Sequence, residues 1–244
     1  MGHGMHSPFV FDFITNVLND QQHKLCYQPI ENRRAALINN SNRIEVEDFG
    51  AGSGVIRSNK RRIDKIAASS LKPKKYAQLM HRMVSYYKPA KILELGTSFG
   101  ITTSYLAKGS ETASVYTFEG SSAIAAIAHQ TFDALSINNI ILQQGNFDNT
   151  LSDFLTSNPA IDLAFIDGNH RKKPTLQYFE QLLSTTNEHA ILIFDDIHWS
   201  EEMESAWEEI KNHPSVTLSI DLFFIGIVLF KKEFLVKQHF SIRY

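Results

Sequence analysis

The sequence contains a single cysteine, Cys26, in 244 residues. One cysteine cannot close an intramolecular disulfide or supply a Cys-based zinc site, and it is consistent with a reducing compartment. An excess of one charge is also lacking, because 24 Lys and Arg stand against 26 Asp and Glu. The net charge of −2 creates no global attraction to nucleic acid or to an anionic membrane, so an anionic partner would have to be recognised locally.

Long hydrophobic runs and targeting segments are missing as well. No apolar stretch approaches the ~20 residues of a membrane span, and the start, MGHGMH, has no basic leader before an apolar run. His6 stands where a myristoylation signal has Ser or Thr. The sequence is 43% hydrophobic and 20% charged, which is typical of a globular protein. We expect a cytoplasmic protein without membrane association.

Residues 1–75 differ in pattern from the rest and predict an N-terminal helical cap. Ser7-Pro8 is a helix start, with Ser as N-cap and Pro at the first helical position, and apolar residues follow at helical spacing. Two more helices are predicted near 31–40 and 63–71. No run in this stretch is apolar enough for a buried strand.

Residues 76–244 alternate between strand and helix patterns and form the second predicted domain. Short apolar runs, each followed by polar residues and a helical segment, predict a doubly wound α/β sheet covered on both faces. These runs are 92–95, 114–118, 140–142, 161–166 and 190–194. Near the end, 216–220 and 223–230 have almost nothing between them, which predicts an antiparallel pair at one sheet edge.

Ligands bind such sheets at the carboxyl ends of the strands, so the residues after each strand are the functional candidates. Gly96 and Gly100 follow the first strand, and the helix after them offers free N–H groups to a carboxylate or phosphate. Glu119 ends the second strand about 20 residues further on, where a carboxylate would accept both hydroxyls of a ribose. The alternative is an ordinary turn with a solvated Glu.

A competing glycine-rich loop lies upstream, at residues 48–54, with the sequence DFGAGSG. It matches a nucleotide-binding pattern more closely than the loop after 92–95. The residues before it alternate between charged and apolar side chains, however, and no strand-end acid follows at the right distance. We therefore interpret it as a lid or turn.

Three motifs, KILELGTSFG (91–100), FEG (118–120) and QGNF (144–147), resemble those of class I S-adenosylmethionine-dependent methyltransferases. The nearest branch is that of catechol and sugar O-methyltransferases, and the resemblance covers about residues 76–231. It implies a Rossmann-like, seven-stranded sheet with an antiparallel last strand. The cofactor-binding residues that it implies are Glu94, Gly96, Thr97, Ser98, Gly100 and Thr102, then Glu119 and Gly120, then Asn146 and Phe147, and Asp167.

Each group of these residues has an implied role. Glu94, Gly96, Ser98 and Thr102 would hold the amino acid end of S-adenosylmethionine, and Glu119 the ribose. Asn146 and Phe147 would hold the adenine. Asn146 departs from the Asp that is common in the family, although the carbonyl oxygen of an amide can still accept from the adenine amine.

Three carboxylates follow the fourth and fifth predicted strands, at Asp167, Asp195 and Asp196. They would repel one another unless protonated or neutralised, and no Lys or Arg is adjacent to Asp195 or Asp196. All-oxygen ligation suits Mg²⁺, Mn²⁺ or Ca²⁺, and metal-dependent O-methyltransferases, which the pattern resembles, bind Mg²⁺ there. The alternative is that Asp195 or Asp196 caps the next helix and Asp167 only contacts solvent.

His170 stands three residues after Asp167, where the catechol enzymes carry a basic residue. Its imidazole could take the proton of a substrate hydroxyl, with Asp167 as its partner in catalysis. The alternative is a polar loop histidine or a further metal ligand.

The remaining features predict less. The basic stretch from Arg57 to Lys75 is interpreted as a solvated face and not as a nucleic-acid site, because no aromatic residues interleave with it. Trp199 stands beside the acids and could wall a substrate pocket. A homodimer through Phe223, Phe224 and the tail 233–244 is left open.

The sequence predicts transfer of the methyl group of S-adenosylmethionine to a hydroxyl of a small molecule, assisted by a divalent metal. An alternative is an NAD(P)-dependent oxidoreductase on a Rossmann fold. Its usual Tyr-x-x-x-Lys pair occurs only as Tyr87 and Lys91, before the first strand. A non-catalytic module that binds S-adenosylmethionine is the third hypothesis.

Overall fold

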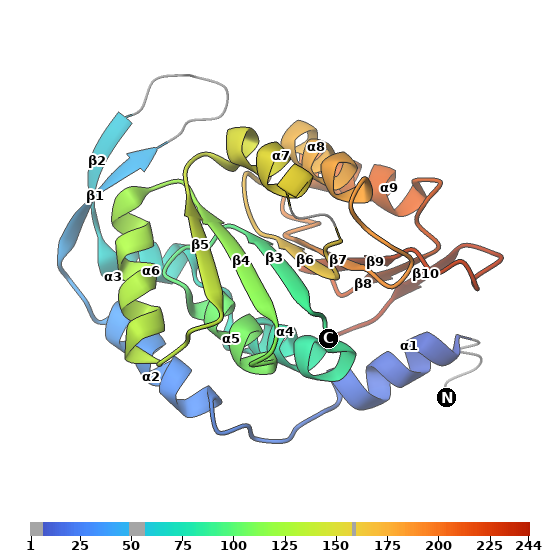
Figure 1. Ribbon diagram of the computed structural model, residues 1–244, viewed down its shortest axis with the longest axis horizontal. Coiled ribbons are helices and arrows are strands. Elements are labelled where there is room, and N and C mark those ends of the chain that lie inside the picture. The colour runs from blue at the N-terminus through green and yellow to red at the C-terminus, as the bar shows by residue number, and fades with distance from the viewer. Residues whose placement is uncertain (1–6, 49–56, 158–159) are drawn as a thin grey trace.

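A mostly parallel sheet forms the centre of the computed structural model (Figure 1), which describes residues 7–48, 57–157 and 160–244. In the described part of the chain the sheet has eight strands in the order β10-β8-β9-β7-β6-β3-β4-β5. The parallel strands are β3 (Lys91–Leu95), β4 (Ser114–Glu119), β5 (Ile140–Gln144), β6 (Leu163–Ile166), β7 (Ile191–Asp195), β8 (Leu218–Asp221) and β10 (Gln238–Ser241). β9 (Ile225–Leu229) is antiparallel to both of its neighbours, β7 and β8.

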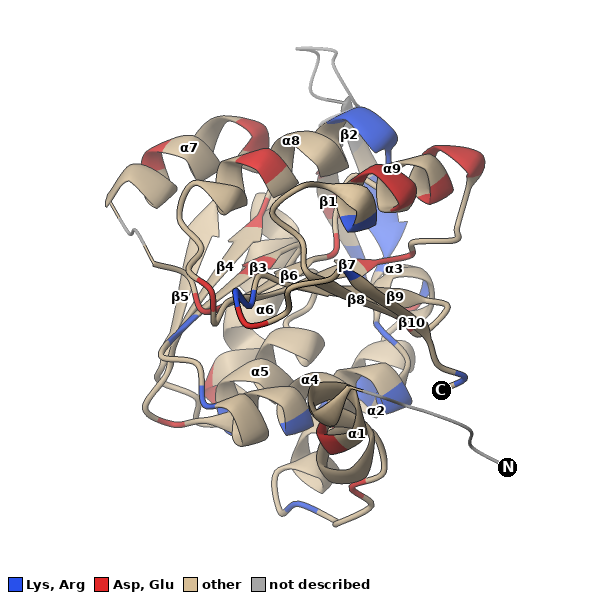
Figure 2. Ribbon diagram, turned by 90° about the vertical axis from the view of Figure 1, so that its right-hand side faces the viewer, with Lys and Arg blue, Asp and Glu red and all other residues tan. Residues whose placement is uncertain are grey.

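Helices cover both faces of the sheet, which Figure 2 shows edge-on. One layer contains α7 (Phe147–Ser157), α8 (Lys172–Leu183) and α9 (Glu201–Asn212). The opposite layer contains α1 (Pro8–Phe13) with its π-helical continuation Ile14–Leu18, α2 (Tyr27–Ile38), α4 (Lys74–Tyr87) and α5 (Ile101–Gly109). α3 (Ile63–Ser70) packs on α2, and α6 (Ser122–Ala134) packs beside α5.

The central strands β3, β6 and β7 are buried because their side chains alternate between two cores. Ile92 of β3 packs with apolar residues of α1 and α4. Its neighbours Leu93 and Leu95 pack on the other face with residues of α7, α8 and α9. A strand that is apolar on both faces fits only the interior of a covered parallel sheet. The predicted doubly wound α/β fold is therefore confirmed.

The predicted number of seven strands is wrong, because β10 adds an eighth. Its sequence, QHFS, is only half-buried, so it has no apolar run that could be recognised. The antiparallel pairing of β8 and β9 is confirmed. This pair does not form the sheet edge, however, since β10 pairs with β8 on the outer side.

The N-terminal region is not wholly helical. Its three predicted helices are present, but β1 (Arg43–Asp48) and β2 (Arg57–Arg62) form a separate antiparallel hairpin. The charged residues of this hairpin gave no strand signal, and among the hairpin residues whose burial is described only Val46 is buried. The glycine-rich loop, apart from Asp48, lies outside the described residues. Ser7 precedes α1 as expected, but its side chain makes no capping hydrogen bond.

The N-terminal elements lie in two places. α1 packs beside α4 against the sheet, far from a capping position. α3 and the linker after it border the carboxyl ends of the strands. Within the described residues, the helices are all too short or too polar to span a membrane.

Candidate active site

A cavity of about 700 Å³ opens at the carboxyl ends of β3, β4, β6 and β7. Its strand-end lining includes Gly96, Ser98, Glu119, Asp167 and Asp195. The opposite wall comes from α3, the linker 71–73 and the start of α4. The volume lies within the usual range for a small-molecule site, and its position is the one that the parallel sheet favours.

The turn after β3 brings the backbone of two loops together. Gly96 has a φ of +103°, and a Cβ there would overlap the carbonyl oxygen of Asp167 after β6. Glycine is therefore required by the protein itself, in addition to any ligand that approaches this turn. Ser98 follows with a φ of +50°, and its hydroxyl lies 2.8 Å from that of Ser70 on α3.

Glu119 is held in a fixed position on the cavity wall. Its carboxylate accepts hydrogen bonds from the backbone N–H groups of Ser98 at 2.9 Å and Ser121 at 3.0 Å. Burial raises the pKa of Glu119, and these N–H groups oppose that rise. A carboxylate has more acceptor positions than two N–H groups fill, so Glu119 can still accept from ligand hydroxyls.

Some of the residues implied for the cofactor lie behind the cavity wall. Glu94 is fully buried and accepts hydrogen bonds from the hydroxyls of Thr103 and Thr117, at 2.6 Å from the latter. Burial raises the pKa of Glu94 to about 8, against these two hydrogen bonds. Thr97 also bonds Thr117, at 2.6 Å. Glu94 and Thr97 are absent from the described cavity lining.

Four further residues that were predicted to bind the cofactor also lie outside the described cavity lining. Among the described residues, Gly100, Thr102, Gly120 and Asn146 do not line the cavity, whereas Phe147 does. Gly100 has a φ of +77°, and a Cβ there would overlap the ring of Phe132. The side chain of Asn146 accepts from the N–H of residue 148 at 2.9 Å, in the first turn of α7. These residues shape the loops around the cavity.

The acids after β6 and β7 come together as predicted, with His170 between them. His170 Nε2 lies 3.5 Å from Asp167 Oδ1, and its Nδ1 lies 3.8 Å from Asp196 Oδ2. Burial raises the pKa of Asp167, while the charge of Lys72 lowers it. The sequence prediction therefore located a real cluster of titratable side chains.

Lys72 is the part of this cluster that sequence reasoning missed. Its ammonium group forms an ion pair with Asp195 and lies 3.9 Å from Asp167 Oδ2. No Lys or Arg is adjacent to Asp195 in the sequence, but the fold brings the ammonium group of Lys72 to it. Lys72 stands in a polar stretch that was interpreted as a solvated face, and nothing in the sequence connects it with an acid 123 residues away.

The predicted metal would have to share the acid cluster with Lys72. One ligand atom each from Asp167, His170 and Asp195 lie within 4.8 Å of one another, while Asp196 is not part of this set. Lys72 lies at the same acids. Two like unit charges 4 Å apart repel each other by about 4 kcal/mol near a protein surface. The repulsion between an ammonium group and a divalent cation at that distance is about twice as large. With Lys72 in this position the residues do not fit a divalent cation.

Aromatic side chains border the same end of the cavity. Tyr76, Trp199 and Phe224 all line it, and the rings of Tyr76 and Phe224 meet edge to face at 5.7 Å. Trp199 is 73% exposed and lines the same cavity as His170. The mouth beside the acids therefore offers apolar surface to a second ligand.

Comparison with known proteins gives a family match and several structural matches. Residues 93–197 match the family model of a methyltransferase domain. The S-adenosylhomocysteine-bound methyltransferase of Podospora anserina has a TM-score of 0.64 at 16% identity, covering 95% of this chain and 100% of that chain. The O-methyltransferase of Bacillus cereus in complex with S-adenosylhomocysteine has a TM-score of 0.60 at 19% identity, covering 91% and 97%.

A third solved structure is the O-methyltransferase TomG of Streptomyces achromogenes in complex with S-adenosylmethionine. It has a TM-score of 0.60 at 14% identity, covering 91% of this chain and 95% of that chain. Identities this low establish a shared fold. A comparison with curated proteins gives no significant match.

Proposed function

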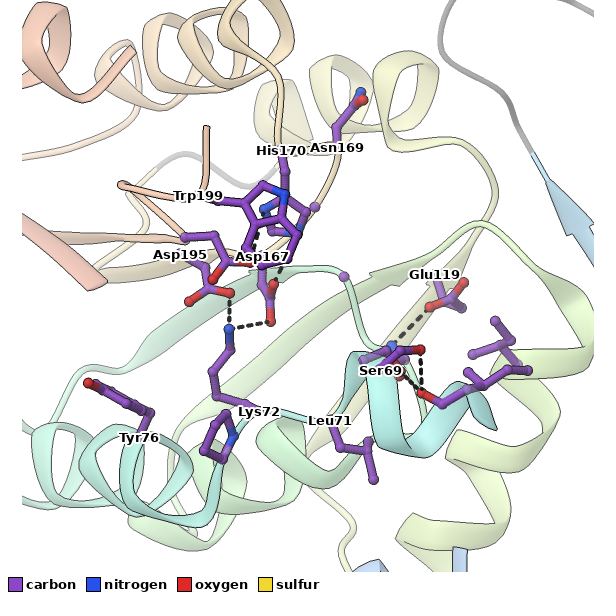
Figure 3. A pocket seen from close by; sticks show the side chains of 18 of the residues that line it. Ser69, Leu71, Lys72, Tyr76, Glu119, Asp167, Asn169, His170, Asp195 and Trp199 are labelled. Atoms are coloured by element: carbon purple, nitrogen blue, oxygen red, sulfur yellow. Dashed lines mark hydrogen bonds and ion pairs between the residues drawn. The ribbon is translucent and has the colours of Figure 1, made fainter. Parts of the chain in front are cut away.

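We propose that the chain is a class I S-adenosylmethionine-dependent methyltransferase that methylates a hydroxyl group of a small molecule, because residues 93–197 match a methyltransferase domain and the fold is that of O-methyltransferases. The observation that carries this proposal is the shared cavity. Figure 3 shows Glu119 on one side of the cavity and Asp167, Asp195 and His170 on the other, and the turn at Gly96 and Ser98 also lines it. One cavity can therefore hold a methyl donor and an acceptor next to each other.

The donor half of the cavity is assigned to the residues that line it. Glu119 accepts from the ribose hydroxyls, and the turn at Gly96 and Ser98 holds the amino acid end. Phe147 packs against the adenine. S-adenosylmethionine, when bound, supplies a methyl group on a positively charged sulfur. The protein mainly has to align this group with the acceptor, because alignment removes much of the entropic part of the barrier.

The acceptor half supplies the acid–base chemistry. His170 can accept the proton of the acceptor hydroxyl as a general base, because it lines the cavity beside the acids. Asp167 and Asp196 flank its ring on two sides, so a positive charge on the imidazole is stabilised once the proton has moved. The aromatic side chains of the mouth, Tyr76, Trp199 and Phe224, offer apolar surface to the acceptor beside this histidine.

Calorimetry with S-adenosylhomocysteine tests the donor site. Glu119→Ala should weaken binding about tenfold or more, which is the scale of a lost charge-assisted hydrogen-bond pair. The matched control is Glu111→Ala, because Glu111 is exposed and precedes β4 at its other end. Equal affinities in wild type and Glu119→Ala would contradict the assignment. NAD is measured in parallel and should not bind.

The oxidoreductase alternative has no structural support in the described residues. Tyr87 is the Tyr of its expected pair, and it stacks on Phe9 with ring centroids 5.9 Å apart. This contact is at the amino end of β3, whereas the cavity is at the carboxyl end. A non-catalytic module would bind S-adenosylhomocysteine but transfer no methyl group to any hydroxylated acceptor.

A divalent metal is the second hypothesis for the acceptor half. The close approach of Asp167, His170 and Asp195 favours it, and so does Asp195 Oδ1, which is buried without a hydrogen-bond partner among the described residues. This hypothesis requires Lys72 to leave the acids. Metal binding therefore has to be measured separately from methyl transfer.

A further inference from the structure

We propose that Lys72 is the resident cation of the acid cluster, and that its ammonium group takes the place of a divalent metal beside the acceptor. The role toward the acceptor rests on the proposed methyl transfer. The occupation of the cluster does not, because it follows from contacts within the chain.

Burial and charge support this inference. The side chain of Lys72 is 10% exposed, that of Asp195 is fully buried and that of Asp167 is 16% exposed. Among the described residues, Lys72 is the only Lys or Arg within ion-pair distance of Asp195. A buried carboxylate that loses its partner is strongly destabilising. Asp195 therefore needs a cation at this place, and the chain supplies one.

The backbone of Lys72 is fixed independently of its side chain. Its carbonyl oxygen accepts from Arg34 Nη1 at 2.7 Å, and the Arg34 guanidinium also binds Glu31 at 3.0 Å. Glu31 in turn accepts from the hydroxyl of Tyr105 on α5 at 2.8 Å. The linker 71–73 is thus anchored to two helices, and its side chain at 72 is directed into the cavity (Figure 3).

The same linker connects the two halves of the cavity. Ser70, at the end of α3, bonds Ser98 of the donor turn, and Lys72 reaches the acids two residues later. A surface lysine would be expected to extend into water, since desolvating an ammonium group is costly. The ammonium group of Lys72 is instead buried among the acids, on an anchored linker, which points to a role in the site.

That role follows from the chemistry of an ammonium group. It has three N–H donors and no acceptor. Lys72 donates a hydrogen bond to Asp195 and lies 3.9 Å from Asp167 Oδ2, so an N–H donor is left for an oxygen in the cavity. A fixed positive charge beside an acceptor hydroxyl favours its deprotonated form, as a metal would.

Electron paramagnetic resonance with Mn²⁺ as the probe tests the inference without any acceptor. Wild type should show no stoichiometric Mn²⁺ binding. Lys72→Met removes the charge and should bind Mn²⁺ at least about tenfold more tightly, because a like charge has left the acids. The matched control is Lys74→Met, since Lys74 is exposed two residues away, and it should behave as wild type does.

Two results would overturn the inference: Mn²⁺ binding by wild type as tight as by Lys72→Met, or no binding by a folded Lys72→Met. If Lys72→Met fails to fold, the double variant Lys72→Met, Asp195→Asn decides. Recovery of folding in the double variant supports the ion pair, and equal instability contradicts it. S-adenosylhomocysteine binding is measured on the same samples. If wild type does not bind S-adenosylhomocysteine, the proposed function is contradicted, but the inference about Lys72 is not.

Discussion

Gly96 illustrates how one residue serves both the fold and the site. Its φ of +103° and its contact with the Asp167 carbonyl leave no room for a Cβ. Gly96→Ala should therefore destabilise the protein by more than the ~1–3 kcal/mol of backbone strain alone, as measured by urea unfolding, and S-adenosylhomocysteine binding should fall with it.

Gly145→Ala is the matched control for this change. Gly145 has a φ of +128°, but a Cβ there would meet only the Thr150 methyl group at 3.4 Å. Gly145→Ala therefore measures the cost of the positive φ alone, without the overlap that a Cβ at Gly96 makes with the Asp167 carbonyl. Equal destabilisation by the two substitutions would show that the close approach to Asp167 does not matter.

At the same scale, the sequence predicted the residues that follow strands and missed the one that reaches them from elsewhere. Glu119, Asp167 and His170 line the cavity because strand ends of a parallel sheet meet at one edge. Glu94 has the right place in the motif, but the alternation of β3 turns it toward α5. Lys72 could not be found, because its contact depends on how the N-terminal elements pack.

At the scale of elements, prediction succeeded where apolar residues were continuous. β6 and β7 are buried throughout, and β3 is buried from Ile92 to Leu95. The apolar runs of all three strands were recognised. β2 has the sequence RSNKRR, and β10 is half-buried at a sheet edge. Such strands are stabilised by pairing with a neighbour and carry little signal of their own.

The contribution of β10 can be measured by truncation after residue 236. This removes the pairing with β8, the ring of Phe240 from the core, and Tyr244, whose ring contacts Tyr76 at 5.5 Å. We expect the free energy of unfolding to fall by about 3 kcal/mol or more, from the burial of two large side chains. Urea unfolding measures this loss.

Tyr244→Phe is the control for the truncation. It keeps the ring and removes only the hydroxyl, which accepts from Arg82 Nη2 at 2.5 Å. A truncated protein that unfolds at the same urea concentration as wild type would show that β10 adds nothing to the sheet. If Tyr244→Phe lowers the free energy of unfolding as much as the truncation does, the effect belongs to the Tyr244 hydroxyl and not to β10.

At the scale of the whole molecule, two buried ionisable groups give stability opposite dependences on pH. Glu94 has a folded pKa of about 8, raised by burial, so its contribution is present at low pH and is lost as the pH rises through that value. His81 on α4 has a pKa lowered to about 4, first by burial and then by the charges of Lys24 and Arg82. Burial therefore favours the neutral form of His81 over the protonated form.

The His81 dependence has a definite sign and window. The unfolded chain binds a proton at this histidine below about pH 6.5, whereas the folded protein does so only near pH 4. Stability is therefore fully present above pH 6.5 and falls by about 3 kcal/mol as the pH decreases to 4. His81→Gln, which is neutral and can still bond the Tyr27 hydroxyl at the 3.3 Å site, should lack this part of the loss.

Urea unfolding at pH 7, 6, 5 and 4 measures the difference between wild type and His81→Gln, which cancels the other titrating groups. His189→Gln is the control, because that side chain is 77% exposed and its removal should leave the pH profile unchanged. A difference that stays constant from pH 7 to 4 would mean that His81 accepts a proton in the folded protein as readily as in the unfolded chain. The packing of α2 against α4 and α5 would then tolerate a charge that its burial should exclude.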